Sequence, residues 1–486
     1  MNLPHAPLAL ALLLGCSAPA AFADPLPPRF LQNAEGQSAL WNGIGQLQTP
    51  TSGCTATLID SRSPEHPGTP AYLLTAGHCI NQAAATVTRD QPIEGSVTFN
   101  YFSDTVEQRT RVALREVKWA AMHGADLAII ELDSTLDSLI EGGINPMNLA
   151  TQPEDGAEML VLGIAGDDTL QWSACTAHWA GTVVEVPWVW RHQVKNACAG
   201  VRSGMSGGAF IDPTGNGLFA VTGTTTFGST AQDRRGAPFE INNGQAQWTD
   251  STNYGSTVDH LQACFSEGRF KRDARGCALE PAFSLLPDTG QPPVAALKLA
   301  LDAGGQAVAP SWGYRFGLDT PAYRYKAVRD PQSCENPQHY SHAISAQDAV
   351  IDDPLPAVPG MHFLCITGVD SADQVSWPGL LRNSVSHGVR LHEAGPTKMP
   401  RVGMEWTEDG QLFVSLRLEA PHLTGLRLKR GLPDETDCED PAGYTEFATP
   451  IAFIRALQDP PLRLCSYGTD SNGQLSALQV TTIPPS

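Results

Sequence analysis

One short stretch decides the fold of this chain: Leu73-Leu74-Thr75-Ala76-Gly77-His78-Cys79. Its apolar residues are typical of a buried strand, its small residues permit a turn, and His78 follows beside a cysteine that can anchor it. A second strand-like run, residues 52–59, contains Cys54, the natural disulfide partner of Cys79. An imidazole held at the end of a strand is suited to general acid–base catalysis.

Two further segments supply the groups that such a histidine needs for acyl transfer by a serine. Asp126 directly precedes an apolar run, and Ser206 lies in Gly204-Met205-Ser206-Gly207-Gly208. A serine nucleophile requires a base, a carboxylate that orients the base, and N–H donors for the oxyanion. The order His, Asp, Ser, at separations of 48 and 80 residues, favours a catalytic triad over a turn acid and a loop serine.

These segments resemble the trypsin/chymotrypsin-fold serine proteases of the bacterial secreted type. The family's Thr-Ala-Ala-His-Cys stands here at residues 75–79, its Asp-Leu-Ala at residues 126–128, and its Gly-x-Ser-Gly-Gly at residues 204–208. The likeness covers roughly residues 43–265. It implies a mainly β fold, a double six-stranded β-barrel, with no cofactor and no metal.

The resemblance also implies a role for each site residue. His78 is the general base and then the acid, Asp126 orients its ring, and Ser206 is the nucleophile. The amides of Gly204 and Ser206 form the oxyanion hole. In residues 223–228, Thr226 lies near the triad carboxylate and Gly228 pairs with the substrate backbone. Because His78 must be neutral to accept a proton, we expect activity to fall below about pH 6.5.

Two residues depart from the family pattern. Met205 precedes the nucleophile, where zymogen-type relatives have an Asp that pairs with a newly cut N-terminus. We therefore expect an oxyanion hole that packing preforms. Gly200 lies six residues before Ser206, where the family often has an acid that selects Lys or Arg. Trypsin-like cleavage is thus not supported, although Asp233 or Glu240 could reach a specificity pocket.

The first residues read as a targeting segment. Residues 7–14 are apolar, and Ala21-Phe22-Ala23 has the small-x-small pattern of signal-peptidase cleavage, which predicts a signal peptide over residues 1–23. The alternative is a lipoprotein box at residues 13–16, in which Cys16 would carry the lipid. We expect a secreted or periplasmic protein, with a lipid-anchored form as the alternative.

The number of cysteines is consistent with an exported protein. Without Cys16 ten remain, an even set that predicts five disulfides, and pairing of sequential neighbours is the simplest connectivity. No CxxC pair or His/Cys cluster has the spacing of a metal site. The ten are Cys54, Cys79, Cys175, Cys198, Cys264, Cys277, Cys334, Cys365, Cys438 and Cys465.

Length, composition and net charge limit the number of domains, the secondary structure and the kinds of partner that we expect. A chain of 486 residues exceeds a single core, and 45 Gly, 38 Pro and only 17% charged residues favour many short strands. The net charge of −20 argues against a nucleic-acid partner. Beyond residue 23 no apolar run approaches the roughly 20 residues of a membrane-spanning helix.

The C-terminal part contains a tandem repeat. Cys-Glu-x-Pro begins at Cys334 and again at Cys438, and Gly-x-Asp-Ser begins at Gly368 and again at Gly468. Partial alternation of apolar residues predicts two small β-sandwich domains, each with one disulfide. We expect a protease domain over residues 24–284, a linker over 285–295, and repeats over 296–388 and 389–486.

Together these observations predict a monomeric, secreted serine endopeptidase that acts on protein or peptide substrates. We expect the repeats to tether or position the protease, with a cell surface or polysaccharide as the candidate contact. An alternative is a catalytically weak or silent protease fold that acts in binding or adhesion through the repeats.

Overall fold

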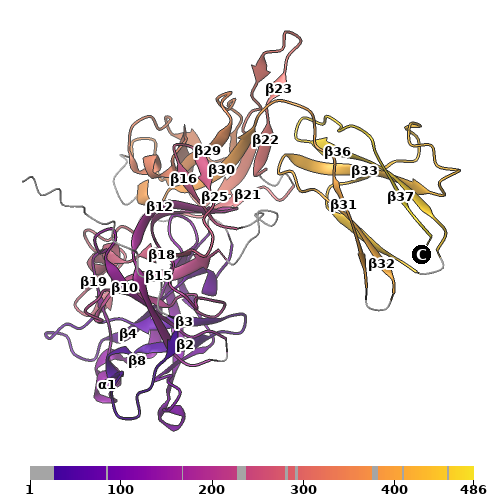
Figure 1. Ribbon diagram of the computed structural model, residues 1–486. Helices are drawn as coiled ribbons and strands as arrows, with labels where there is room; N and C mark the ends of the chain where they lie inside the picture. The colour runs from indigo at the N-terminus through magenta and orange to yellow at the C-terminus, as the bar shows by residue number, and fades with distance from the viewer. Residues whose placement is uncertain are drawn as a thin grey trace, which may run out of the picture.

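The computed structural model describes residues 27–83, 86–166, 168–226, 237–279, 283–290, 294–374, 381–407, 410–456 and 459–485. The predicted signal peptide, with Cys16, lies outside the described residues, as do Gly228 and Asp233. Within these ranges the chain is built almost entirely of strands, so the predicted mainly β class is confirmed (Figure 1).

The N-terminal part begins with a closed barrel. Six strands pair in the ring β7-β6-β2-β3-β4-β8, and β7 pairs with β8 to close it, while β5 adds to the other side of β7. The strands β4 and β8 are almost continuously buried, since both of their faces are covered. The strands are β2 (Ile44–Gln48), β3 (Gly53–Leu58), β4 (Pro70–Thr75), β5 (Val87–Pro92), β6 (Ser96–Phe99), β7 (Thr110–Ala121) and β8 (Leu127–Thr135).

A second, eleven-stranded sheet follows. Its strands pair in the order β1-β11-β10-β14-β15-β18-β13-β12-β16-β17, and β9 pairs with β15. The strands are β1 (Arg29–Phe30), β9 (Asn148–Leu149), β10 (Glu158–Gly163), β11 (Gln171–Thr176), β12 (His178–Glu185), β13 (Trp188–Asn196), β14 (Ala209–Ile211), β15 (Gly217–Thr225), β16 (Phe239–Asn242), β17 (Gln245–Gln247) and β18 (Asn253–Thr257). Leu162, Ala209 and Val221 of this sheet belong to the same core as the first barrel, so the two sheets pack together.

Helices are short and few. α1 (Leu136–Glu141) is a short α-helix, residues 381–382 are also α-helical, and no helix in the described ranges combines the length and apolar character needed to cross a bilayer. The 3-10 helices are η1 (Ala39–Trp41), η2 (Gly77–Cys79), η3 (Val106–Gln108), η4 (Asp259–Cys264) and η5 (Pro331–Glu335). Two further strands, β19 (Phe265–Ser266) and β20 (Arg269–Phe270), form a hairpin after η4.

The next part of the chain has a core of its own, from Phe283 to Val389. A three-stranded sheet pairs β21-β25-β28, a five-stranded sheet pairs β22-β30-β29-β26-β27, and β23 pairs with β24. The strands are β21 (Leu285–Pro287), β22 (Ala296–Lys298), β23 (Ala300–Leu301), β24 (Ala307–Val308), β25 (Tyr314–Leu318), β26 (Ala322–Val328), β27 (Ile344–Ser345), β28 (Val350–Ile351), β29 (Gly360–Val369) and β30 (Val385–His392).

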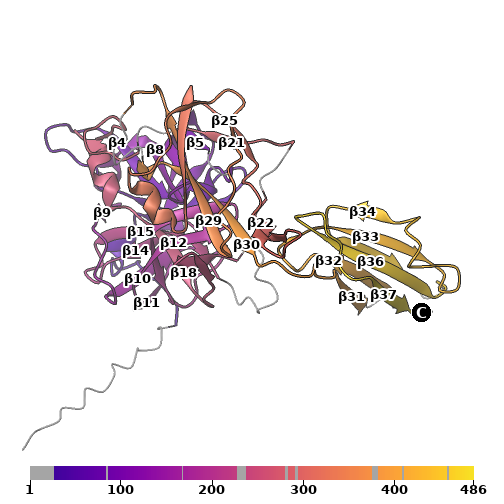
Figure 2. The ribbon, with the colours of Figure 1, turned by 90° about the horizontal axis from the view of Figure 1, so that it is seen from above.

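The last part has a separate core, from Leu412 to Ile483, and projects from the rest of the molecule (Figures 1 and 2). It pairs β31-β32-β35 and β34-β33-β36-β37. A buried ion pair, Lys298 Nζ to Asp470 Oδ2 at 2.7 Å, holds it to the preceding part. The strands are β31 (Arg401–Trp406), β32 (Leu412–Arg417), β33 (Leu423–Gly431), β34 (Thr445–Phe447), β35 (Ile451–Arg455), β36 (Leu462–Asp470) and β37 (Gln479–Ile483).

The two C-terminal parts share local contacts as well as sequence. The Tyr340 hydroxyl donates to the Cys334 carbonyl at 2.8 Å, and the Tyr444 hydroxyl donates to the Cys438 carbonyl at 2.7 Å.

Five disulfides join sequential neighbours, as the simplest connectivity predicted. They are Cys54–Cys79, Cys175–Cys198, Cys264–Cys277, Cys334–Cys365 and Cys438–Cys465.

The first C-terminal part is joined to the protease part through a buried arginine. Arg191 of β13 is 1% exposed, and its guanidinium donates to the Ser384 hydroxyl at 3.0 Å and to the carbonyls of Arg382 and Ser384 at 2.6 and 2.9 Å. Beside it, Met361 and Phe363 of β29 share a hydrophobic cluster with Val184, Val189 and Phe239. These contacts make residues 283–392 part of one packed body with the second sheet and the barrel that it packs on.

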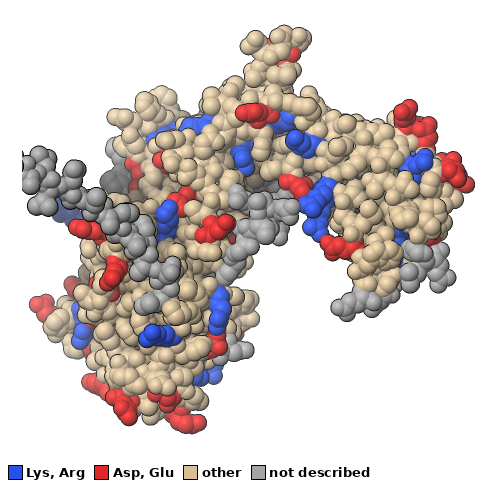
Figure 3. Space-filling model, viewed as in Figure 1, with Lys and Arg blue, Asp and Glu red and all other residues tan. Residues whose placement is uncertain are grey.

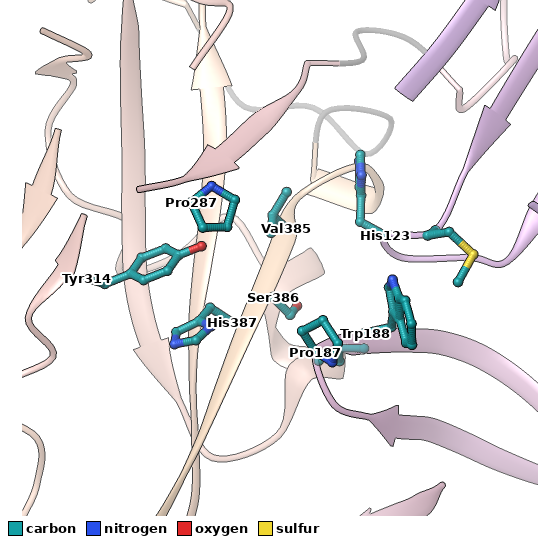
Figure 4. A pocket seen from close by; sticks show the side chains of 10 residues that line it. His123, Pro187, Trp188, Pro287, Tyr314, Val385, Ser386 and His387 are labelled. Atoms are coloured by element: carbon teal, nitrogen blue, oxygen red, sulfur yellow. The ribbon is translucent and has the colours of Figure 1, made fainter. Parts of the chain in front are cut away.

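A small cavity of about 40 Å³ lies along this junction (Figure 4). His123, Pro187 and Trp188 line it from the protease part, while Tyr314 and His387 line it from the first C-terminal part, with their rings stacked at 4.2 Å. Burial lowers the pKa of His387 to about 4, and burial together with the charge of Arg191 lowers that of His123 to about 4. Both rings are therefore neutral at neutral pH.

Candidate active site

His78 and Asp126 meet at the edge of the first barrel. β4 carries the chain into η2, which holds His78, and β8 begins directly after Asp126. The Asp126 carboxylate accepts from the His78 backbone N–H at 2.9 Å and lies 2.8 Å from His78 Nδ1. Asp126 is 1% exposed, whereas the His78 side chain is 24% exposed. Asp126 thus fixes the Nδ1 edge of the imidazole, and the His78 side chain remains partly exposed to solvent.

Hydrogen bonds from the second sheet fix the backbone of Asp126. The Asp126 N–H donates to the Ser256 hydroxyl oxygen at 3.0 Å, and Gln193 Nε2 donates to the same oxygen at 2.9 Å. Ser256 lies on β18 and Gln193 on β13, so the second sheet positions an acid that the first barrel contributes.

The loop that contains Ser206 is seated against the strand end that precedes His78. The Thr55 N–H donates to the Ser206 carbonyl at 2.8 Å, and the Thr75 hydroxyl donates to the Thr55 carbonyl at 2.8 Å. At Gly207, which has φ +80°, a Cβ would lie 2.1 Å from both Thr55 O and Thr75 Oγ1. Only glycine permits this close approach, which brings Ser206 to the same corner as His78.

In the described residues no hydrogen bond joins the Ser206 hydroxyl to His78. Such bonds are commonly long in the absence of substrate and tighten when it binds. Ser206 itself is half-buried, so its hydroxyl is accessible.

The loop also presents two backbone donors. Gly204 has φ +94°, and a Cβ there would lie 2.3 Å from the Gly166 backbone nitrogen. The Gly204 carbonyl points away from the site, where it accepts from the Thr55 hydroxyl at 3.1 Å. Among the described residues, no acceptor binds the amide N–H of Gly204 or of Ser206. Two uncommitted donors beside a serine are what an oxyanion hole requires.

Met205 anchors this loop by packing. Its side chain is 2% exposed within an apolar cluster, it fills the space left by the missing side chain of Gly163, and its sulfur accepts from Gln171 Nε2 at 3.1 Å. These contacts support the expectation that packing, rather than an ion pair with a new N-terminus, shapes the site.

We expect Met205→Asp to destabilise the protein by about 3–5 kcal/mol, because it buries a carboxylate that has no cationic partner. Met205→Leu conserves volume and should cost less than about 1.5 kcal/mol. Thermal or chaotrope unfolding of both variants measures the difference. Equal stability of the two variants would contradict a packing role for this side chain.

The electrostatic surroundings of His78 favour its protonated form. Burial, the largest influence, lowers its pKa, but the charge and hydrogen bond of Asp126 and the charge of Glu185 outweigh it, so that the pKa lies above 6.5. Since only the neutral ring can accept a proton, the midpoint of the acid limb of kcat/KM should lie above pH 6.5. A pH–rate profile checks this, and a midpoint below 6.5 would contradict it.

The predicted contact of Thr226 with the triad carboxylate was wrong by three residues. Gly223 lies against Asp126, since a Cβ on it would be 3.0 Å from Asp126 Oδ2. The Thr226 hydroxyl is instead engaged by the backbone of Thr252, whose N–H donates to it at 2.7 Å. The pairing of β15 with β18 is irregular between Thr222 and Thr225, the interval that contains Gly223.

The candidate specificity residues have different surroundings. Gly200 packs against Pro28, whose Cγ would lie 2.6 Å from a Cβ at that position. Glu240 is already neutralised, because Lys195 Nζ donates to both of its oxygens at 2.9 and 2.7 Å. Sequence reasoning missed Glu185, at the end of β12, which acts electrostatically on both His78 and Asp126. No motif surrounds it, so only the fold could reveal it.

The site does not suit a metal ion. In the described residues the one group with metal-binding side chains in reach is Cys54, His78 and Cys79. Its two sulfurs are joined in a disulfide and His78 Nδ1 is bonded to Asp126. The arrangement instead provides a base, an orienting acid, an alcohol and two amide donors.

Comparisons with known proteins give one family match and several similar solved structures. The family model of the trypsin-like peptidase domain matches residues 54–221. No curated protein matches the chain. Among solved structures, the chain is similar to a thermostable serine protease, AL20, from an extremophilic microorganism (15% identity, 47% of this chain and 94% of that chain, TM-score 0.28). It is also similar to the protease Anisep from Arthrobacter nicotinovorans (14%, 44% and 90%, 0.29) and to human heparin binding protein (13%, 48% and 91%, 0.31).

The family match spans His78, Asp126 and Ser206, the three residues that the fold gathers where the first barrel meets the second sheet. The chain therefore contains a trypsin-like peptidase domain, and that domain has the trypsin-like β fold that the sequence predicted.

Proposed function

We propose that this protein is an exported serine endopeptidase. The observation that carries the proposal is the hydrogen bond between His78 Nδ1 and Asp126 Oδ2, which leaves the other ring nitrogen free to act as a base beside the Ser206 loop. Five disulfides support a protein that works in an oxidising compartment. A secreted or periplasmic location, with lipid attachment at Cys16 as the alternative, remains our proposal.

In the proposed reaction, the Ser206 oxygen attacks the scissile carbonyl while His78 Nε2 takes its proton. The amides of Gly204 and Ser206 stabilise the resulting oxyanion, and Asp126 stabilises the imidazolium. His78 then protonates the leaving amine, and an acyl-enzyme on Ser206 remains. Water, deprotonated by His78, hydrolyses this ester and returns the site to its starting state. Each step uses only side chains and amides of this domain.

Labelling with a fluorophosphonate tests the nucleophile. The full chain should be labelled at Ser206 and should digest a peptide library, whereas Ser206→Ala should do neither. Ser203→Ala, a change at an exposed serine of the same loop, is the matched control and should react like the wild type. Equal labelling of wild type and Ser206→Ala would overturn the assignment. Absence of labelling in the wild type would favour a silent protease fold that acts in binding.

The C-terminal parts have different roles in this proposal. Residues 283–392 share a buried interface with the barrels and so belong to the catalytic body. The part beyond residue 392 projects outward and is the better candidate for contact with a cell surface or polysaccharide (Figure 1). On the face that Figure 3 shows, acidic and basic side chains are interspersed over both C-terminal parts rather than gathered into one patch.

A further inference from the structure

Glu185 stands at the tip of a hairpin that the fold fixes beside the catalytic acid. It ends β12 and pairs with Trp188 across a two-residue turn. The returning strand is bonded to the segment that leads into Asp126: the Gly124 N–H donates to the Val189 carbonyl at 3.3 Å, and the Arg191 N–H donates to the Gly124 carbonyl at 2.9 Å. The hairpin tip is therefore held in place relative to Asp126.

The Glu185 side chain turns toward the catalytic residues. The Thr224 hydroxyl is close enough to its carboxylate to lower the carboxyl pKa, and Thr224 directly follows Gly223, the residue that lies against Asp126. Its charge acts on both His78 and Asp126. Glu185 is half-buried and its neighbour Val186 is 41% exposed, so the carboxylate remains accessible from solvent.

Within the described part of the chain Glu185 forms no ion pair, unlike three other partly or fully buried acids. Glu240 pairs with Lys195, Glu335 with His192 and Asp470 with Lys298. In the described residues no lysine, arginine or histidine lies within ion-pair distance of Glu185. Burial and the nearby charge of Asp126 raise the pKa of Glu185; the Thr224 hydroxyl and the charge of His78 act in the opposite direction but do not outweigh them, and the carboxylate has no ion-pair partner in the free protein. A bound cation would supply it.

We propose that Glu185 binds a cationic side chain of the substrate, a lysine or arginine close to the scissile bond, and so determines specificity. This inference rests on the proposed endopeptidase function. The acid comes from the β12–β13 hairpin rather than from the loop before the nucleophile, where Gly200 offers no charge. Hydrogen bonds to charged groups of this kind correspond to a preference of about 10- to 100-fold in kcat/KM.

Paired peptides that differ only by lysine or norleucine, placed in turn at each position flanking the scissile bond, test this inference on the full chain. Fluorophosphonate titration counts the active sites in each preparation. The wild type should prefer lysine at one position by about 10- to 100-fold. Glu185→Gln should reduce that preference to less than about threefold, and Glu185→Lys should favour glutamate there. Circular dichroism confirms that each variant is folded.

Glu158→Gln is the matched control, since Glu158 is an exposed acid at the start of β10, and it should retain the preference of the wild type. A labelled, active wild type with no lysine preference would overturn the role of Glu185, as would an unchanged preference in Glu185→Gln. A wild type that is neither labelled nor active would overturn the proposed endopeptidase function itself, a result that the titration distinguishes from the first two.

Discussion

Asp126→Asn should lower kcat by about 10⁴-fold while leaving the fold intact. The two carboxylate oxygens accept from two donors, the His78 backbone N–H and His78 Nδ1. Asparagine has a single acceptor oxygen, so its amide N–H₂ would face one of these donors. If it faces Nδ1, the ring carries its proton on Nε2 instead, where it can no longer accept the proton of Ser206.

Steady-state kinetics with a peptide substrate, normalised by fluorophosphonate titration, measures this loss. Asp133→Asn is the matched control, because Asp133 lies on β8, the strand that follows Asp126, and is exposed. It should keep kcat within about twofold, as expected of a surface change. A decrease of less than tenfold in Asp126→Asn would show that Asp126 does not orient the base.

Arg191→Met should lower the free energy of unfolding by about 3–5 kcal/mol, the cost of removing one partner from a buried polar network. The change leaves the carbonyls of Arg382 and Ser384 and the Ser384 hydroxyl without their donor. A buried acceptor without a partner loses the hydrogen bonds it would make with water. Because most domains are stable by only about 5–15 kcal/mol, the loss should be large enough to detect by chemical denaturation.

Arg401→Met provides the comparison, since Arg401 forms an exposed ion pair with Glu419 at 2.9 Å. Such surface pairs contribute about 0–1 kcal/mol. Equal effects of the two changes would show that the Arg191 contacts do not hold the two parts together. The same contacts lead us to expect that residues 24–284 alone, the predicted protease domain, are less stable than a chain that extends to residue 392.

The candidate site could be predicted where its residues lie in short sequence motifs. His78, Asp126 and Ser206 each lie in a short segment that can be recognised in the sequence alone. Thr226 was misplaced because the sequence does not show which residue of β15 lies against Asp126, and in the structure that residue is Gly223. Glu185 was missed for a related reason: its position depends on pairing between β12 and β13 and on contacts with a residue 39 positions away, Thr224.

The domain arrangement was harder to foresee. The proline-rich stretch near residue 287 reads as a boundary, and Phe283 and Leu285 do begin a new core there. The sequence gives no sign, however, that Arg191 is buried, because arginine is ordinarily an exposed residue. A linker in the sequence therefore marks the start of a new core but not the independence of the two parts.

The spacing of the cysteines has a consequence for how the chain matures. Each bridge closes a short loop, of 13 to 31 residues, and each closes before the next pair begins. A polypeptide that emerges N-terminus first can thus be oxidised in order, with the correct partner always the most recent thiol to appear. We expect disulfide formation in this chain to depend little on an isomerase. In each pair the second cysteine follows the first with no other of the ten cysteines between them.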